Sequence, residues 1–358
     1  MTQVTFCNPI LLIDGREIQN ISNVSISFPG GNQLNSLSLS IGEPDLDENS
    51  LFGKSISFYL NYGAQDNIPI FRGYVKSTTP SNNSIRLKCT DVRGFIKSKE
   101  APKVHLDDFS NYDGYSLAQF FKKYIEENIN INKTYIGLDL MNDTYPLFSL
   151  NGERGTFVPY DLVTTLLAKI IDTDTDAQNP LDYIIDVVDD GNNSHMVFKK
   201  KKLLTDSPAL TLSDYDGIQT LSYKKRAKTF VANVSFEKDG DSESKESKEH
   251  VFKYGSLPHG LSSINISSDA KDPAGARERG RLEILKDLNN NAEISIRASK
   301  GHYIGLESIV QVNVKDQSVS GKHRLIGKTI SWNKGTVNLV LNLSQKPIKI
   351  SDYILSTT

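Results

Sequence analysis

The chain contains two stretches that decide its fold: IFRGYVKSTTPSNNSIRLKCTD at residues 70–91 and HRLIGKTISWNKGTVNLVLNL at residues 323–343. Each reads as a strand, a short polar turn and a second strand, with apolar and polar residues alternating along both arms. The turns fall at Ser-Asn-Asn 81–83 and Asn-Lys-Gly 333–335. Two such units, one near each end of a 358-residue chain, predict two small β-domains around a middle region, an organisation more typical of a scaffold than of a catalyst.

The region around the first of these units is rich in predicted strands. Residues 21–28, 34–41 and 55–60 alternate apolar and polar side chains, and Pro-Gly-Gly 29–31 and Asn-Tyr-Gly 61–63 supply turns between them. This pattern predicts an antiparallel sheet that curls or closes. We therefore expect a first β-barrel domain over residues 1–98.

The middle region, residues 99–205, is predicted to be an α+β domain. A capping-box pattern at Ser116 and Gln119 opens a predicted helix that extends to about Ile129. A second predicted helix covers 161–171, and strands are predicted over 183–188 and 195–199.

The second β-region begins near Ala209, includes 229–237 and is then interrupted. Residues 239–250 are charged and polar, which predicts an exposed loop, and Asp272-Pro273 opens a predicted helix that reaches about residue 289. Strands resume at Glu293. The predicted division is a second β-barrel over 206–238 and 290–345, an inserted charged loop and helix over 239–289, and a C-terminal tail over 346–358. The fold class is α+β and mainly β, with two related antiparallel β-barrels that we expect to superpose.

Composition narrows the function classes. A net charge of −2 and a pI near 6.3 give no overall attraction to nucleic acid, although a basic face is compatible with that total. Cys7 and Cys89 lie in apolar runs and are interpreted as reduced, buried thiols, with a disulfide as the open alternative. The N-terminus shows no signal-peptide pattern, and the apolar runs fall far short of the about 18 residues that a membrane span needs.

One acidic cluster resembles a calcium loop. Asp172, Asp174 and Asp176 have the one-three-five spacing of such loops. The positions that need glycine and a bidentate glutamate hold Ala177 and Tyr183 instead. We expect an acidic surface loop without bound calcium.

Two basic clusters leave alternatives open. Lys199–Lys202 fits either a phosphate contact or, more simply, an exposed strand end. Arg277, Arg279 and Arg281 occupy the start of a predicted helix, where the helix dipole disfavours cations, so an acidic partner is expected either within the chain or on another subunit.

Catalytic signatures are missing from the sequence. The histidines do not form a zinc motif, and there is no P-loop, nucleophile elbow or dinucleotide fingerprint. Glu126 and Glu127 are adjacent on a predicted helix and diverge from one another. The sequence predicts no catalytic, cofactor-binding or metal-binding residues, and the protein is expected not to be an enzyme; interface residues remain unassigned. The histidines are His105, His195, His250, His259, His302 and His323.

The order of these elements matches a known family. The pattern Phe71-x-Gly73-x-Val75 leads into a strand ending at Asp91, the helix over 162–167 follows, and strands over 301–314 precede the hairpin that contains Trp332. In this order the chain resembles the baseplate hub proteins of contractile-tailed bacteriophages, the family of late-control-D type proteins and of the amino-terminal half of type VI secretion spike proteins. The resemblance spans nearly the whole chain and rests on order more than on a strict signature. The charged loop at 239–250 departs from it. The length suits a stand-alone hub without a long extension or needle.

The resemblance implies a homotrimer with two similar β-barrels per subunit, whose six barrels form a ring. Such a ring joins a hexameric tail tube, or its initiator protein, to a trimeric central spike beside other baseplate proteins. The implied location is the virion tail baseplate, assembled in the bacterial host cytoplasm. DNA is expected to pass transiently through the ring, without sequence-specific binding, without membrane insertion and past a lining free of strong cationic stripes.

Two other function classes remain open. One is a carbohydrate- or host-binding β-barrel module of a tail tip, for which several exposed aromatic residues would be expected, whereas the single Trp332 falls in an alternating strand. The other is an enzyme such as a peptidoglycan hydrolase, which would need an acid pair or a metal set. Solution mass separates a trimeric hub from a glycan-binding monomer.

Overall fold

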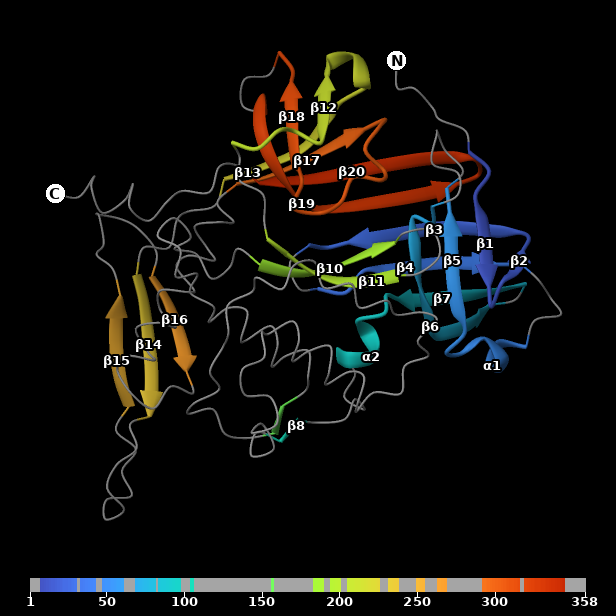
Figure 1. Cartoon of the computed structure of the whole chain (residues 1–358), viewed down its shortest axis with the longest axis horizontal. Coiled ribbons are helices and arrows are strands. Elements are labelled where there is room, and N and C mark those ends of the chain that lie inside the picture. The colour runs from blue at the N-terminus through green and yellow to red at the C-terminus, as the bar shows by residue number, and fades with distance from the viewer. Residues whose placement is uncertain are drawn as a thin grey trace.

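The computed structural model describes residues 7–30, 33–42, 47–60, 68–81, 83–97, 104–105, 156–157, 183–189, 194–200, 205–225, 231–237, 249–254, 263–268, 292–315 and 319–344. This part of the chain is mainly β, with short helical turns, and its largest element is a 13-stranded sheet (Figure 1). The predicted fold class is confirmed.

The first half of the large sheet follows the predicted alternation closely. Strand β3 covers the predicted range, and buried residues alternate with exposed or half-buried ones along β4, β5 and β7. The elements of this half are β1 (Ile10–Ile13), β2 (Arg16–Ile18), β3 (Ile21–Phe28), β4 (Ser36–Ile41), α1 (Glu48–Leu51), β5 (Ser55–Tyr59), β6 (Phe71–Ser81), β7 (Ser84–Thr90) and α2 (Gly94–Lys97).

The second half is built from strands late in the chain. Its elements are β12 (Leu210–Ser213), the 3-10 turn η3 (Asp214–Asp216), β13 (Gln219–Lys225), β17 (Ala292–Ala298), β18 (Ile309–Asn313), β19 (Gly321–Asn333) and β20 (Thr336–Ser344). The β19–β20 turn places Lys334 and Gly335 in left-handed backbone, as a tight two-residue hairpin turn requires.

The two halves share one strand order. In the first half the neighbours run β3-β4-β7-β6-β5-β1, and in the second half they run β13-β17-β20-β19-β18-β12. The counterparts in the two halves are therefore β3 and β13, β4 and β17, β7 and β20, β6 and β19, β5 and β18, and β1 and β12. One pair differs in direction, since β1 is antiparallel to β5 whereas β12 is parallel to β18. This agreement is what two related β-domains require, while their superposition and the predicted domain boundaries stay predictions.

The irregularities of the two halves also correspond. Strand β6 carries an extra residue between Val75 and Ser77 against β7, and β19 carries one between Leu325 and Gly327 against β20. Strands β3 and β13 each carry a register shift against their partners as well. Because bulges are specific features of a strand pair, their coincidence aligns the halves residue by residue.

A single strand pair joins the halves. The later part of β19 leaves β18 and pairs antiparallel with β3, so that Lys328 faces Phe28 and Trp332 faces Val24. We refer to this pairing as the β3–β19 junction. The core is continuous across it, since Ile26 and Ile330 are a buried cross-strand pair within one cluster that includes Leu37 and Leu339.

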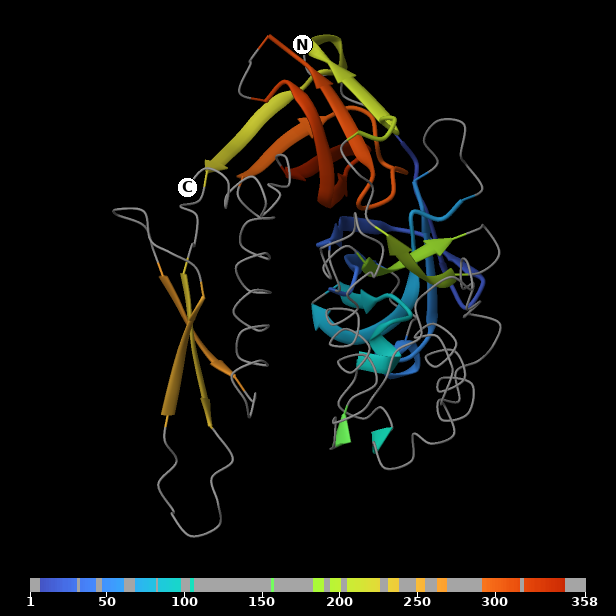
Figure 2. The same cartoon turned by 60° about the vertical axis from the view of Figure 1, so that its left-hand side comes forward.

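Within the described residues, three smaller sheets accompany the large one. They are the hairpin of β10 (Tyr183–Asp189) with β11 (Ser194–Lys200), the pair of β8 (Val104–His105) with β9 (Thr156–Phe157), and the set of β14 (Val231–Glu237), β15 (Glu249–Tyr254) and β16 (Ser263–Ser268). The last set is a separate sheet in both views (Figures 1 and 2). The predicted strands at 183–188 and 195–199 are confirmed as β10 and β11.

The sequence interpretation of residues 229–250 needs correction. Strand β14 was predicted within the second β-region, but it pairs with β15 and β16. The predicted loop ends two residues early, because Glu249 and His250 begin β15. Strand alternation identifies a strand without specifying its partner, which explains the first error. The helices predicted over 116–129, 161–171 and 272–289 lie outside the described residues. Across the part of the chain that the structure describes, no helix has the length and apolar character to cross a membrane.

The β3–β19 junction depends on a close approach at Gly30. Its backbone is left-handed, with φ of +78°, and an added Cβ would lie 1.7 Å from the carbonyl oxygen of Ile326. Gly15 has the same φ but no atom within 4 Å of such a Cβ. Gly15 is therefore a matched control for the backbone conformation alone.

We expect Gly30→Ala to lower the free energy of unfolding by about 3 kcal/mol and Gly15→Ala by about 1 kcal/mol. The difference reflects the clash that only Gly30→Ala introduces. Urea unfolding of both variants measures it. Equal losses in the two variants would show that the close approach at Gly30 does not stabilise the junction.

Candidate functional site: two junctions within the chain

A buried lysine reinforces the β3–β19 junction. The Nζ of Lys328 donates hydrogen bonds to the carbonyl oxygens of His302 (2.5 Å) and Ile304 (2.8 Å), and it lies 4.6 Å from the ring centroid of Phe28. Carbonyl oxygens and an aromatic face replace the hydration that this cation loses on burial. Lys328 thereby connects the loop after β17 to the strand pair that joins the halves.

The amino-terminal segment also crosses between the halves. Cys7 donates its backbone N–H to the carbonyl of Gly335 (3.1 Å) and accepts a hydrogen bond from the indole Nε1 of Trp332 (3.2 Å). Trp332 is partly buried against the core, so the core or interface role expected for this residue is met by a contact within the chain. Cys7 and Cys89 are free thiols, and burial raises the pKa of both, that of Cys7 to about 11.

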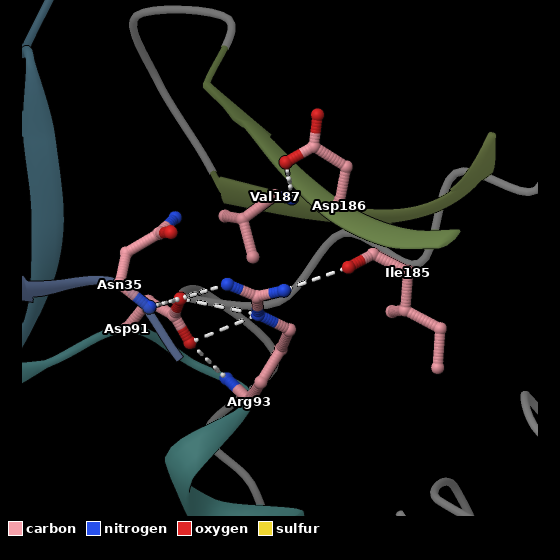
Figure 3. Close-up of polar contacts among 6 residues, drawn as sticks. All are labelled: Asn35, Asp91, Arg93, Ile185, Asp186 and Val187. Atoms are coloured by element: carbon pink, nitrogen blue, oxygen red, sulfur yellow. Dashed lines mark hydrogen bonds and ion pairs between the residues drawn. The ribbon is translucent and has the colours of Figure 1, made fainter. Parts of the chain in front are cut away.

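A second junction holds the β10–β11 hairpin on the first half. Arg93 is buried, and its Nη2 lies 2.6 Å from Oδ2 of Asp91 while its Nη1 donates to the carbonyl of Ile185 in β10 (2.7 Å) (Figure 3). Asp91 also accepts hydrogen bonds from the backbone N–H groups of Asn35 (2.8 Å) and Arg93 (3.0 Å). Each charge therefore has several partners, as a buried ion pair requires.

A second arginine contacts the same hairpin. The Nε of Arg72 in β6 lies 3.1 Å from Oδ2 of Asp189, and the hydroxyl of Ser194 donates to that carboxylate (3.0 Å). Ile185 and Met196 of the hairpin are fully buried. Two arginines from the first half thus contact β10 at two points, Ile185 and the last residue Asp189, and hold this hairpin on the sheet.

The second half contains a buried pair of charged side chains near the start of β19. Glu307 has left-handed backbone (φ 61°) and lies 3.6 Å from Nε of Arg324, both side chains being mostly buried. Its counterpart in the first half is Gly53 (φ 75°): Gly53 donates its N–H to Val75, and Glu307 donates to Leu325. The repeat therefore extends to this loop.

Two buried histidines lie nearby. Burial, with the charge of Lys328, lowers the pKa of His302 to about 4, and burial lowers the pKa of His323. Nε2 of His323 is 2.7 Å from the carbonyl oxygen of Val319. Both imidazoles are neutral at pH 7, so they act as packed polar groups there.

Most of the sequence-predicted candidates lie outside the described residues. Asp172, Asp174, Asp176 and the three arginines near 277–281 lie outside the described residues, so the calcium and subunit-contact interpretations stay predictions. Lys199 and Lys200 end β11, so the run lies at a strand end as expected, while its exposure stays a prediction. Among the residues that the structure describes, no group of His, Cys, Asp or Glu could hold a metal ion.

Sequence reasoning missed the residues that form both junctions. Arg93 and Asp91 are two residues apart after a predicted strand, a spacing that also occurs in ordinary turns. Lys328 sits at a core-facing position of an alternating strand, and a charge in that register was the available signal.

Comparison with known proteins identifies the fold. No family model matches the sequence, and no curated protein sequence does. A tail protein from Neisseria meningitidis has TM-score 0.64 at 13% identity, over 95% of this chain and 97% of that one. The prophage MuSo2 43 kDa tail protein of Shewanella oneidensis has TM-score 0.60 at 12% identity, over 95% and 98%. An Escherichia coli component of the type VI secretion system, described as structurally similar to bacteriophage T4 tail proteins, has TM-score 0.56 at 10% identity, over 95% and 77%.

The chain therefore has the fold shared by phage tail proteins and a type VI secretion component. The resemblance drawn from the sequence is confirmed at the level of the fold. The identities are too low to carry more than that.

The Arg93 junction leads to a testable expectation. Arg93→Met leaves the Asp91 carboxylate buried without its counter-charge, and we expect a loss of about 3 kcal/mol in the free energy of unfolding. The control is Lys54→Met, which removes an exposed partner of Asp14 (2.7 Å) and should cost less than about 1 kcal/mol. Amide hydrogen exchange of β10 should accelerate in Arg93→Met only. Unchanged exchange in β10 would show that Arg93 does not hold the hairpin.

His302 predicts a loss of stability in acid. The folded protein keeps this imidazole neutral down to about pH 4, whereas the unfolded chain takes up the proton near 6.5. Unfolding thus binds a proton between these values, so the free energy of unfolding falls as the pH drops from 6.5 to 4, by about 2 kcal/mol. In His302→Gln the fall should be smaller, with the remainder partly due to His323. A pH series of urea unfolding tests this, and an unaltered slope in the variant would contradict it.

Proposed function

We propose that this protein is a non-enzymatic structural hub of a phage tail baseplate. In this role three chains form a ring between the hexameric tail tube and the trimeric central spike. The observation that carries the proposal is the internal repeat. One chain holds two halves with the same strand order and the same bulge positions, so three chains present six similar units.

The two ends of the large sheet differ in a way that supports an adapter. The β6–β7 and β19–β20 turns both lie at the end of the sheet where β3 begins. Trp332, next to the β19–β20 turn, pairs with Val24 near the start of β3. Ile85, next to the β6–β7 turn, pairs with Ile41, and Ile41 pairs with Ile21, the first residue of β3. At this end both halves present short hairpins, and three chains would offer six like surfaces to a sixfold tube.

At the opposite end the halves diverge. Strand β7 leads into α2 and the region of the β10–β11 hairpin, whereas β13 leads into the insertion that contains β14, β15 and β16. Three chains would present a threefold surface there, which suits a trimeric spike.

The sheet face opposite the core suits weak contact with passing DNA. Small hydroxyl side chains continue across the β3–β19 junction on this face: Ser25, Ser27, Ser36, Ser38, Ser40, Thr329 and Ser331. Hydroxyl groups contact phosphate without the counterion release that makes lysine and arginine bind it strongly. Arg86 and Lys88 of β7 are exposed charges on the same face, so a lining wholly free of cations is not expected, and its freedom from a cationic stripe stays a prediction.

Solution mass and electron microscopy test the hub. We expect the purified chain to reach a mass of three copies at high concentration, and a particle containing it to hold three copies on the tail axis between tube and spike. Six copies in the particle, or a position away from the axis, would refute the proposal.

A further inference from the structure

Several strands of the large sheet have a neighbour on one side only in the described part of the chain. Besides β2 and β12, they include β13 and the later part of β6. Strand β13 pairs with β17 on one side only. In β6, Phe71–Tyr74 pair with β5, and Tyr74 also pairs with β7, whereas Ser77–Ser81 pair with β7 alone. An exposed strand edge is a template for another chain.

The internal repeat identifies what these edges match. Strand β13 is the counterpart of β3, and the part of β6 after its bulge is the counterpart of the part of β19 after its bulge. Those counterparts are the strands that pair with each other at the β3–β19 junction. The chain therefore contains one complete junction and the two separate edges of a second.

We propose that a second copy of this chain completes the second junction, with β13 of one copy antiparallel to Ser77–Ser81 of the next. Alignment of the two halves at their bulges fixes the register of this pairing. The predicted pairs are Lys225 with Thr78, Lys224 with Thr79, Tyr223 with Pro80 and Ser222 with Ser81. They correspond, in the same order, to the pairs of the β3–β19 junction: Phe28 with Lys328, Ser27 with Thr329, Ile26 with Ile330 and Ser25 with Ser331. The inference rests on the proposed ring and specifies its contacts. Because each copy has one edge of each kind, the contact is head-to-tail and three copies close it.

The junction between copies is weaker than the junction within the chain. Along a hairpin, pairs whose backbone groups hydrogen-bond to each other alternate with pairs whose backbone groups point outward. Counting from the two-residue turns, the backbone groups of Lys328 and Ile330 point away from β20 and toward β3. Those of Thr78 and Pro80 point away from β7 in the same way. Pro80 has no N–H to donate, and a proline on an edge strand discourages uncontrolled pairing.

Two further reinforcements are absent from the first half. After its bulge β6 runs from Ser77 to Ser81, whereas β19 runs from Gly327 to Asn333, two residues longer, so the position of Trp332 has no counterpart in β6. Thr78 is the counterpart of Lys328 in the first half, and its short side chain cannot make the buried contacts that the lysine makes. The ring is thus built from three strong junctions and three weak ones, and the weak ones are where copies separate and assemble.

Cysteine cross-linking tests the register. The variant Lys224→Cys/Thr79→Cys places two thiols at a non-hydrogen-bonded pair, where side chains of facing strands lie closest. Under mild oxidation of the concentrated full-length chain, we expect covalent dimers and trimers on a non-reducing gel. Ser222→Cys/Thr79→Cys, out of register by two residues, should give far less product. Ser27→Cys/Thr329→Cys is the matched positive control, because it forms the equivalent bond within one chain. The unsubstituted chain controls for Cys7 and Cys89.

The outcomes separate this inference from the proposed function. A trimer by mass whose in-register variant gives no covalent oligomer, or no more than the out-of-register variant, overturns the edge pairing and leaves the hub intact. A chain that is monomeric at every concentration and uncross-linked in all variants overturns both.

A second variant tests the weakness attributed to Pro80. Pro80→Ala restores a donor at each of three junctions, and at about fivefold per hydrogen bond the trimer association constant should rise about a hundredfold. Ser81→Ala, whose backbone points toward β7, should leave that constant unchanged. Equilibrium sedimentation of both variants measures it. An unaltered constant in Pro80→Ala, or an association that passes beyond three copies, would contradict the proposal.

Discussion

The backbone pairing of β3 with β19 is the constraint on which the rest of the large sheet depends. It turns two groups of strands, the first ending at Thr90 and the second beginning at Leu210, into one sheet with one core. A strand pair is directional and its register is specific, so the halves cannot rotate or slide against each other as two tethered domains could. Gly30 and Lys328 both act at this pair: the first lets the backbones approach, and the second ties the loop after β17 to it. The ring proposed above would need this type of rigidity.

The local alternation of apolar and polar residues was sufficient to predict most of the strands of the large sheet. Ile21–Phe28 alternates strictly because one face is buried, and the structure gives β3 the same bounds. The two hairpins that decided the fold have tight turns with polar or glycine residues, so their strands pair with the nearest neighbour in the chain. Pairing between distant strands has no comparable local signal. Nothing in Val231–Glu237 distinguishes a partner in the large sheet from a partner in β15 or β16, and nothing in Val24 or Trp332 announces that they face each other.

The buried charges were beyond sequence reasoning for a related reason. Arg93 and Asp91 read as an ordinary polar turn after β7. Their importance comes from Ile185, more than 90 residues later, whose carbonyl accepts from Nη1 of Arg93. Burying an ion pair is favourable only when the remaining donors and acceptors find partners, and those partners are supplied by the fold. The candidate site therefore became visible only when three distant segments met.

The two halves share a strand order but differ in the residues that occupy equivalent positions. Where the second half has Lys328, Ile330 and Glu307, the first half has Thr78, Pro80 and Gly53. Each change in the first half removes a charge, a donor or a buried contact. Six identical units would form six identical junctions, and such a ring would have no preferred place to open and no threefold face. In the proposed ring, linking two unlike units in one chain would make three junctions permanent, would leave three adjustable, and would let an insertion in one half mark every second position. A ring that must match six subunits on one side and three on the other requires that inequality.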